Sequence, residues 1–452
     1  MLTQNQTKTP SLIYKVRHWV RHSPFDPDLM ALVLVISFAL LLIVNSGDLS
    51  LLCAVCWSMV FGLSTFAVIA ATAKDDLSRQ FLPKIFLWAY TFRVFTLMII
   101  QNYLKAEINY DASSYETYGL MYSDFWRHIS VTPPSTIYGP YSVFVGILYY
   151  VSGNNPYLPQ IINAMVGALI PCVVYDICRR HFGGESVGRA SAVIASLLTA
   201  WVIWSSIAMR DIEVILCIAL VLREAVDLQD GITGLRCLRL LLWLAVIALF
   251  RPYVDLIFGI ALGIAFTFTL ARRPFPRIIL GFCLLCCLGA AADIGGARAI
   301  AAQMIENQTE QLESTRQVVV YKADGEYGAD VHYHDVGDVI RFLPVGLYNF
   351  LGGPFPWTFR GRQFIMAIPE WSSWYFIVYF GVRGFLFLNG KTKKTLPLVT
   401  FFVVGSLLLS VISGNFAISI RHRSMLSMSL VILSGAGWVQ RRQNLTNRLT
   451  AT

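Results

Sequence analysis

Residues that could act on a hydroxyl group follow an apolar stretch that ends near residue 101. Asp111 lies ten residues beyond it, with Tyr115 and Tyr118 close by. A carboxylate at a membrane surface can act as a general base when partial desolvation raises its proton affinity. The tyrosines can stack on a sugar or anchor the segment among lipid headgroups. We predict Asp111 as a catalytic base, the alternative being an ordinary solvated acidic loop. Three weaker candidates share the segment: Glu107, Glu116 and Asp124.

Arginines form the second set of candidates, because a guanidinium matches the oxygen atoms of a phosphate group. The sequence places Arg210, Arg251 and the Arg421-His422-Arg423 cluster between apolar stretches. If these sites converge at one membrane depth, they form an anion site at the level of the lipid headgroups. The alternative is that each arginine binds phosphates of bulk lipid.

The acids beside these arginines have a simpler interpretation. Asp211 adjoins Arg210, and Asp255 follows Arg251 by four positions, which on a helix is one turn. We expect structural pairing within each couple.

A polar stretch at about 296–364 carries further candidates. His332 and His334 stand among acids and could bind a metal, but this spacing puts two rings on one face of any acidic strand. The sequence therefore does not support a metal or other cofactor. Arg341 opens a run rich in proline and aromatic residues that suits a sugar platform or a membrane interface. Asn307 begins a triplet that matches a glycosylation acceptor, which is common by chance.

Composition defines the class of protein that must position these residues. Of 452 residues, 56% are hydrophobic and only 14% are charged, against about 25% charged in soluble proteins. This excludes a cytosolic enzyme, a disordered protein and a nucleic-acid binder. The nine cysteines lie in or beside apolar stretches and predict neither disulfides nor a metal site.

Apolar stretches long enough to span a bilayer recur along the chain. We predict an all-α polytopic membrane protein of about twelve transmembrane helices, with two large outer-face loops and an amphipathic juxtamembrane segment. The expected spans are 29–46, 50–72, 83–101, 157–178, 190–208, 211–227, 237–250, 253–271, 277–294, 366–388, 396–413 and 424–439.

Charge decides whether the apolar segment 135–151 also spans. If it lies on the outer surface, 22 of the 36 basic residues face the cytoplasm, and every short inner loop has three. If it spanned, fifteen of them would face outward, against the positive-inside rule. We therefore predict a surface segment, helical after Pro140, and a multi-pass protein of the cell inner membrane with both termini cytoplasmic.

The predicted organisation has five parts. In chain order they are three N-terminal transmembrane helices (1–101), a first outer loop with the juxtamembrane segment (102–156), helices four to nine (157–295), a second outer loop (296–364), and helices ten to twelve with a cytoplasmic tail (365–452).

The order of segments between about residues 85 and 260 carries a family resemblance. Asp111 opens the first outer loop, a proline-containing membrane-hugging segment follows, and a helix from near Gln160 returns to the basic turn 179–184. This order resembles the integral membrane glycosyltransferases of the C-type (GT-C) fold, the group of the family 39 enzymes, protein mannosyltransferases and aminoarabinose transferase. The chain departs from the pattern in two helices that precede this region, and in Ala112, where many relatives have a second acid.

The resemblance implies transfer of a sugar from a polyprenyl-phosphate-linked donor to a glycan, lipid or protein acceptor on the outer face, with Asp111 as base. Tyr115, Tyr118, Arg210, Arg251, Arg341, Arg421 and Arg423 would then bind substrate. We expect the arginines to lie across a cavity from Asp111, at roughly 6–12 Å, and Arg421 and Arg423 to face it together. The alternatives are a surface-polysaccharide polymerase or O-antigen ligase that uses Arg341, a lipid-linked oligosaccharide flippase, and a structural membrane subunit.

Overall fold

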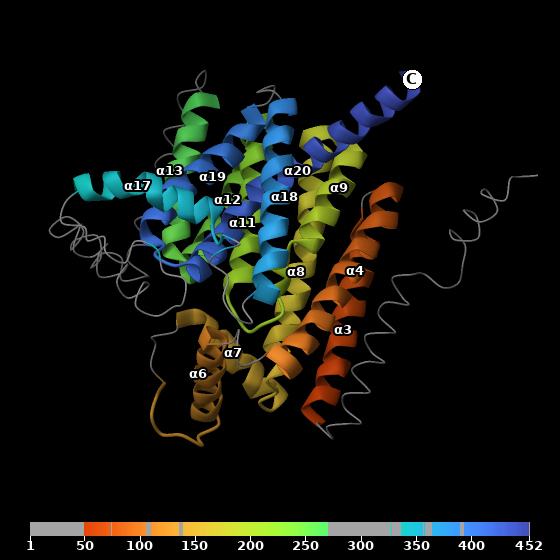
Figure 1. The fold of residues 1–452 in the computed structure, drawn as a ribbon. Coiled ribbons are helices and arrows are strands. Elements are labelled where there is room, and N and C mark those ends of the chain that lie inside the picture. Colours follow the sequence, from red (N-terminus) through yellow and green to blue (C-terminus); the bar gives the residue numbers. More distant parts are fainter. Residues whose placement is uncertain are drawn as a thin grey trace, which may run out of the picture.

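The computed structural model describes residues 49–73, 75–104, 110–134, 139–269, 327, 336–355, 357, 364–388 and 393–451. Every regular element in these ranges is a helix, so the all-α prediction is confirmed for them (Figure 1). The predicted spans 29–46 and 277–294, with Glu107, Asn307, His332 and His334, lie outside the described residues.

Several helices are long and apolar enough to cross a membrane, which indicates a multi-pass membrane protein. Five such segments occur among the described residues: Leu49–Thr72, Asp76–Leu104, Tyr157–Leu197, Lys393–Ile412 and Phe416–Asn447. A shorter apolar helix covers Pro252–Phe268. The total of about twelve spans remains a prediction.

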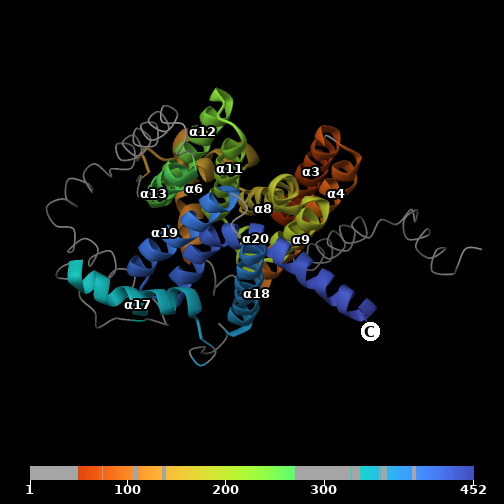
Figure 2. The same cartoon turned by 90° about the horizontal axis from the view of Figure 1, so that it is seen from above.

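One group of helices packs side by side along the bundle (Figures 1 and 2). They are α3 (Leu49–Thr72), α4 (Asp76–Ile99, extended by the π-helical turn Ile100–Leu104), α8 (Tyr157–Cys178), α9 (Gly184–Leu197) and α10 (Thr199–Trp204). Asp75 starts α4 because its carboxylate accepts the backbone N–H of Ser78, which a helix start leaves without a partner. Between α8 and α9 the chain turns at Gly184, whose φ of 75° favours glycine.

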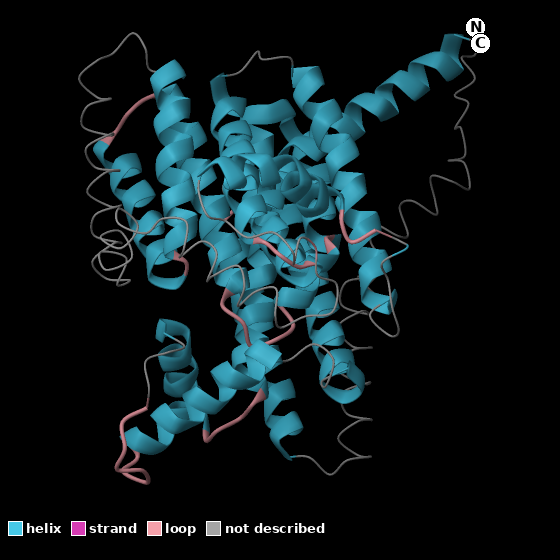
Figure 3. Ribbon diagram, turned by 60° about the vertical axis from the view of Figure 1, so that its left-hand side comes forward, coloured by secondary structure: helices cyan, strands magenta, loops and turns pink. Residues whose placement is uncertain are grey.

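Two short helices form a separate pair at one end of the bundle, opposite the end where the C-terminal helix leaves it (Figure 3). They are α6 (Tyr110–Trp126) and α7 (Gly139–Ser152), and they approach closely because Gly119 lies against Val145. The prediction of a helix after Pro140 is confirmed. Its 14 residues extend about 21 Å, whereas the hydrocarbon core is roughly 30 Å thick. That the segment lies on the surface remains a prediction.

The remaining helices complete the bundle around α20, which runs through its centre (Figure 2). They are α11 (Asp211–Asp230), α12 (Gly234–Phe250), α13 (Pro252–Thr269), α17 (Val336–Gly352), α18 (Phe364–Leu388), α19 (Leu396–Ile412) and α20 (Phe416–Ala451). Gly384 lets α18 pack against α20 almost backbone to backbone, since a side-chain carbon there would collide with the carbonyl of Leu433. α17 lies crosswise to α18 (Figure 1).

The end of the bundle that carries α6 and α7 is called the outer end below, because the charge distribution predicts that it faces outward. The opposite end, where α8 turns into α9 at residues 179–184, is called the inner end.

Candidate functional site

Asp111 lies in the first turn of α6, at the outer end of the bundle. Its side chain is 47% exposed, and its Oδ2 accepts a hydrogen bond from Nη1 of Arg421 at 2.6 Å. Among the described residues no other hydrogen bond reaches this carboxylate, so Oδ1 can still accept a proton from a hydroxyl group. The predicted base is therefore half-exposed and held in place by a cation.

Arg421, on α20, joins Asp111 to a second carboxylate. Its Nε and Nη2 donate to Oδ1 and Oδ2 of Asp211 at 2.9 and 2.7 Å, a bidentate contact that fixes the plane of the guanidinium. Asp211 begins α11 and is fully buried. A buried carboxylate needs such cations, because removing it from water without them costs several kcal/mol.

Arg251 is the second cation on Asp211. It occupies the break between α12 and α13, and its Nη2 donates to Asp211 Oδ1 at 2.8 Å while Nη1 donates to the hydroxyl of Tyr253. Both expected pairings were wrong. Asp211 pairs with Arg251 and Arg421 rather than with its neighbour Arg210, and Arg251 pairs with Asp211 rather than with Asp255. Tertiary contacts of α11 with α20 and with the break between α12 and α13 replace the local ones.

Arg210 differs from these two arginines, because the part of the chain that the structure describes contains no ion pair to it. Its guanidinium lies 5.8 Å from the ring centroid of Tyr115, and its buried Nε has no hydrogen-bond partner. Three arginines and two carboxylates thus lie together, with a net charge of +1. We call this set the outer charge cluster: Asp111, Arg210, Asp211, Arg251 and Arg421.

Tyr115 and Tyr118 extend this site along α6. They follow Asp111 by four and seven positions, so the three side chains share one helix face. Tyr115 is buried and packs edge-on against Tyr141 of α7, with ring centroids 5.1 Å apart. Tyr118 is half-buried. The rival acid Glu116 accepts a hydrogen bond from Gln160 instead.

Asn163 supports the segment that carries Arg210, a role that the sequence analysis missed. This buried side chain on α8 donates to the carbonyls of Ile207 and Met209, both at 2.8 Å, and lies within hydrogen-bond distance of the Tyr141 hydroxyl. It therefore links α8, α7 and the chain just before α11. An amide within an otherwise apolar helix was the available signal, since a buried amide must find partners.

The sequence analysis also missed Glu213 as a candidate site residue. It lies two residues after Asp211 on α11, and both carboxylate oxygens are buried without a hydrogen-bond partner. Carboxylates in this state are costly in a membrane protein and mark candidate functional positions.

Arg423 does not join the outer charge cluster. Its buried guanidinium lies 4.6 Å from the ring centroid of Trp374 and donates to the carbonyl of Gly353. Two residues along a helix turn a side chain by about 200°, so Arg421 and Arg423 point to opposite sides of α20. The expectation that both face Asp111 was wrong for Arg423.

Arg341 also lies outside the cluster. It is on α17, 83% exposed, and contacts Asp338 on its own helix at 3.3 Å. Arg421, in contrast, touches Asp111 directly, so the expected gap of 6–12 Å was wrong for this residue. A cavity at Asp111 remains a prediction.

The inner end carries a second group of charges with a different character. Arg179 donates to both oxygens of Asp75 at 2.7 and 3.1 Å, and together with the Ser78 N–H it holds the Asp75 pKa well below its ordinary value. Arg180 and His181 both contact Asp227, at 3.2 and 2.6 Å. We call this set the inner ion-pair layer: Asp75, Arg179, Arg180, His181 and Asp227. Each member has an opposite charge beside it.

Comparison of the sequence with known protein families and with curated proteins assigns the chain to no family. No model of a known protein family matches the sequence, and no curated protein has a similar one.

Proposed function

We propose that the protein is a membrane glycosyltransferase that moves a sugar from a polyprenyl-phosphate-linked donor to an acceptor at the outer face of the membrane. The observation that carries the proposal is the contact between Asp111 and Arg421, 310 positions apart in the chain. It joins the residue predicted as base to the arginines predicted to bind phosphate.

The proposed reaction is a single displacement. An acceptor hydroxyl approaches Oδ1 of Asp111, which takes its proton as the oxygen attacks the anomeric carbon. The bond between that carbon and the donor phosphate breaks, and its electron pair leaves with the phosphate. Fixed cations stabilise the charge that develops there. The product should have the inverted configuration at the anomeric carbon.

The two contacts of Arg421 suggest how the site admits a donor. One nitrogen holds Asp111, whereas two hold the buried Asp211. The Asp111 contact can therefore be exchanged for a donor phosphate while Asp211 keeps the guanidinium in position. Arg210 adds a cation that no carboxylate among the described residues neutralises, which leaves the site an excess positive charge for an anion.

The test is a transfer assay with the full chain reconstituted in lipid vesicles. Labelled polyprenyl-phosphate sugars and lipid, glycan and peptide acceptors are supplied, and glycosylated product is measured for the wild type, Asp111→Asn and Glu116→Gln. We expect product from the wild type and Glu116→Gln, inverted at the anomeric carbon, and transfer more than 100-fold slower from Asp111→Asn.

Two outcomes would overturn the proposal. Activity that survives Asp111→Asn but is lost in Arg341→Gln would identify a polymerase or ligase that uses the second outer loop. Movement of a lipid-linked sugar across the vesicle membrane without any transfer would identify a flippase.

A further inference from the structure

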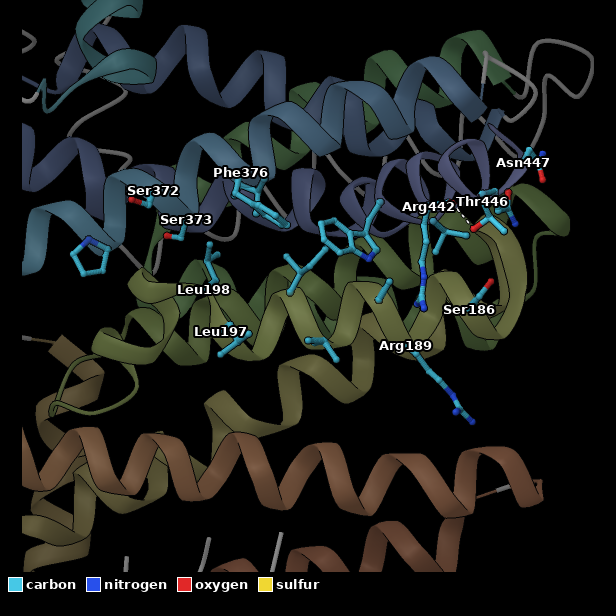
Figure 4. A pocket seen from close by; sticks show the side chains of 18 residues that line it. Ser186, Arg189, Leu197, Leu198, Ser372, Ser373, Phe376, Arg442, Thr446 and Asn447 are labelled. Carbon is cyan, nitrogen blue, oxygen red and sulfur yellow. Dashed lines mark hydrogen bonds between the residues drawn. The ribbon is translucent and has the colours of Figure 1, made fainter. Parts of the chain in front are cut away.

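A groove with a volume of about 1010 Å³ lies between α9, α18 and α20 (Figure 4), and none of its lining residues belongs to the outer charge cluster. Most of its lining is apolar: α9 contributes Val193 and Leu197, α18 contributes Phe376, and α20 contributes Trp438. Three of these side chains are strongly exposed, with 42% for Val193, 47% for Leu197 and 42% for Trp438. In a membrane-spanning bundle, such a groove opens sideways toward lipid chains.

The length of the groove matches one leaflet of a bilayer. Its lining begins at Ser186 on α9, at the inner end, and ends at Leu198, which directly follows α9. Twelve residues of helix extend about 18 Å, close to half of the roughly 30 Å hydrocarbon core. The groove therefore covers the inner half of the bundle.

Polar groups gather where the groove reaches the inner end. Ser186 of α9 and Arg442, Gln443, Thr446 and Asn447 of α20 line this part. The guanidinium of Arg442 points from α20 across the groove toward α9 (Figure 4). In the described part of the chain no carboxylate pairs with it.

The second arginine of the lining, Arg189, has partners of its own. Its Nε contacts Glu185 at 2.5 Å, and its guanidinium lies 5.2 Å from the ring centroid of Phe81. Figure 4 shows it directed away from the groove. Arg442 is thus the cation that the groove presents.

We propose that this groove binds an anionic phospholipid of the inner leaflet, with its phosphate on Arg442 and an acyl chain along Val193, Leu197, Phe376 and Trp438. An apolar channel one leaflet long, to whose polar end the described residues contribute one unpaired cation, has the charge and shape of such a lipid. Cytoplasmic leaflets are rich in anionic lipids, and an arginine at their surface attracts them. The site shares no residue with the outer charge cluster, so it does not depend on the proposed glycosyl transfer.

The test uses the full chain in phosphatidylcholine vesicles that contain a small fraction of photoreactive lipid. The reactive group is a diazirine in the acyl chain of either phosphatidylglycerol or phosphatidylcholine. After illumination, mass spectrometry of peptides locates the label. We expect phosphatidylglycerol to label the groove faces of α9, α18 and α20 about fivefold more than phosphatidylcholine does.

Arg442→Gln should remove that preference, whereas Arg441→Gln is the matched control. Arg441 carries the same charge one residue earlier, but its guanidinium lies against Phe380 and Tyr379 outside the groove. Val193→Trp, which fills the apolar part, should reduce labelling by both lipids. Equal labelling of the wild type by both lipids, or equal loss in Arg441→Gln and Arg442→Gln, would overturn the proposal. Labelling by neither lipid would do so as well, and would mean that another part of the chain or a second copy occupies the groove.

Discussion

The outer charge cluster and the inner ion-pair layer each contain an aspartate at a helix start bound by an arginine from another helix. Asp111 and Arg421 are 2.6 Å apart at the outer end, and Asp75 and Arg179 are 2.7 Å apart at the inner end. Arg179 gives Asp75 a bidentate contact, and the backbone N–H of Ser78 donates to the same carboxylate, so both of its oxygens are engaged. Among the described residues Asp111 receives one contact, because the other two nitrogens of Arg421 donate to Asp211.

The two pairs therefore differ in whether a carboxylate oxygen remains available among the described contacts. A carboxylate with both oxygens engaged stabilises the junction between helices, whereas a carboxylate with one free oxygen beside an excess cation can react. The predictions below test that contrast, from the largest expected effect to the smallest.

Replacing Asp211 with alanine should have the largest effect, on stability. It leaves Arg251 and Arg421 together without their buried counter-ion, a change that costs about 3–5 kcal/mol in comparable buried pairs. Thermal unfolding in detergent should show a strongly lowered midpoint. The control is Arg79→Gln, since the Arg79–Asp76 pair is 57% and 90% exposed and contributes about 0–1 kcal/mol. Equal effects would mean that the outer cluster has no special electrostatic role.

Asp111→Asn should reduce the proposed transfer more than 100-fold without lowering expression, because general-base assistance contributes about 10²–10⁴-fold. The inner counterpart, Asp75→Asn, removes the same charge from the other pair and should leave the rate nearly unchanged. A comparable loss in both variants would show that the rate follows bundle stability rather than chemistry at Asp111.

Arg421→Ala should weaken binding of a polyprenyl-phosphate sugar about 10- to 150-fold, the range of one lost charge-assisted contact. Arg341→Gln, on exposed α17, should leave donor affinity unchanged. Binding is measured by displacement of a fluorescent polyprenyl phosphate from vesicle-embedded protein. If Arg341→Gln causes the larger loss, the donor lies at the second outer loop.

Arg210→Gln should weaken the same binding by about tenfold or less, as expected for a single cation with a tyrosine beneath it. Since Arg210 forms no ion pair with a carboxylate among the described residues, the unfolding midpoint should change little. A large drop in that midpoint would instead assign Arg210 a structural role in the junction between α10 and α11.

The smallest effect concerns pH at the inner layer. The folded-state pKa of Asp75 lies below its unfolded value, so its contribution to stability is present above about pH 4 and is lost as the pH falls through the lowered folded-state pKa. The difference in unfolding midpoint between the wild type and Asp75→Asn should be constant from neutral to mildly acidic pH and vanish in strong acid. A difference that changes near neutral pH would assign the effect to a group other than Asp75.

The sequence alone determined the class of fold and several of the residues that meet in it. Apolar stretches and the placement of basic residues predict membrane helices, a non-spanning helix after Pro140 and the position of Asp111 in a segment beyond them, since these features depend on local composition and helix geometry. Arg210, Arg251 and Arg421 could be selected because each interrupts an apolar stretch.

Only the tertiary structure decided which of these residues act together. Asp211 pairs with two arginines that are 40 and 210 positions away, whereas sequence spacing favoured its neighbour. Arg423 turns away from Arg421 because a helix rotates by about 100° per residue, and the packing of α18 decides that Trp374 receives it. Asn163 fixes the chain before Arg210 through contacts 44 and 46 positions distant. Ion pairs and buried amides satisfy whichever partners packing brings near, and distance along the chain does not encode that choice.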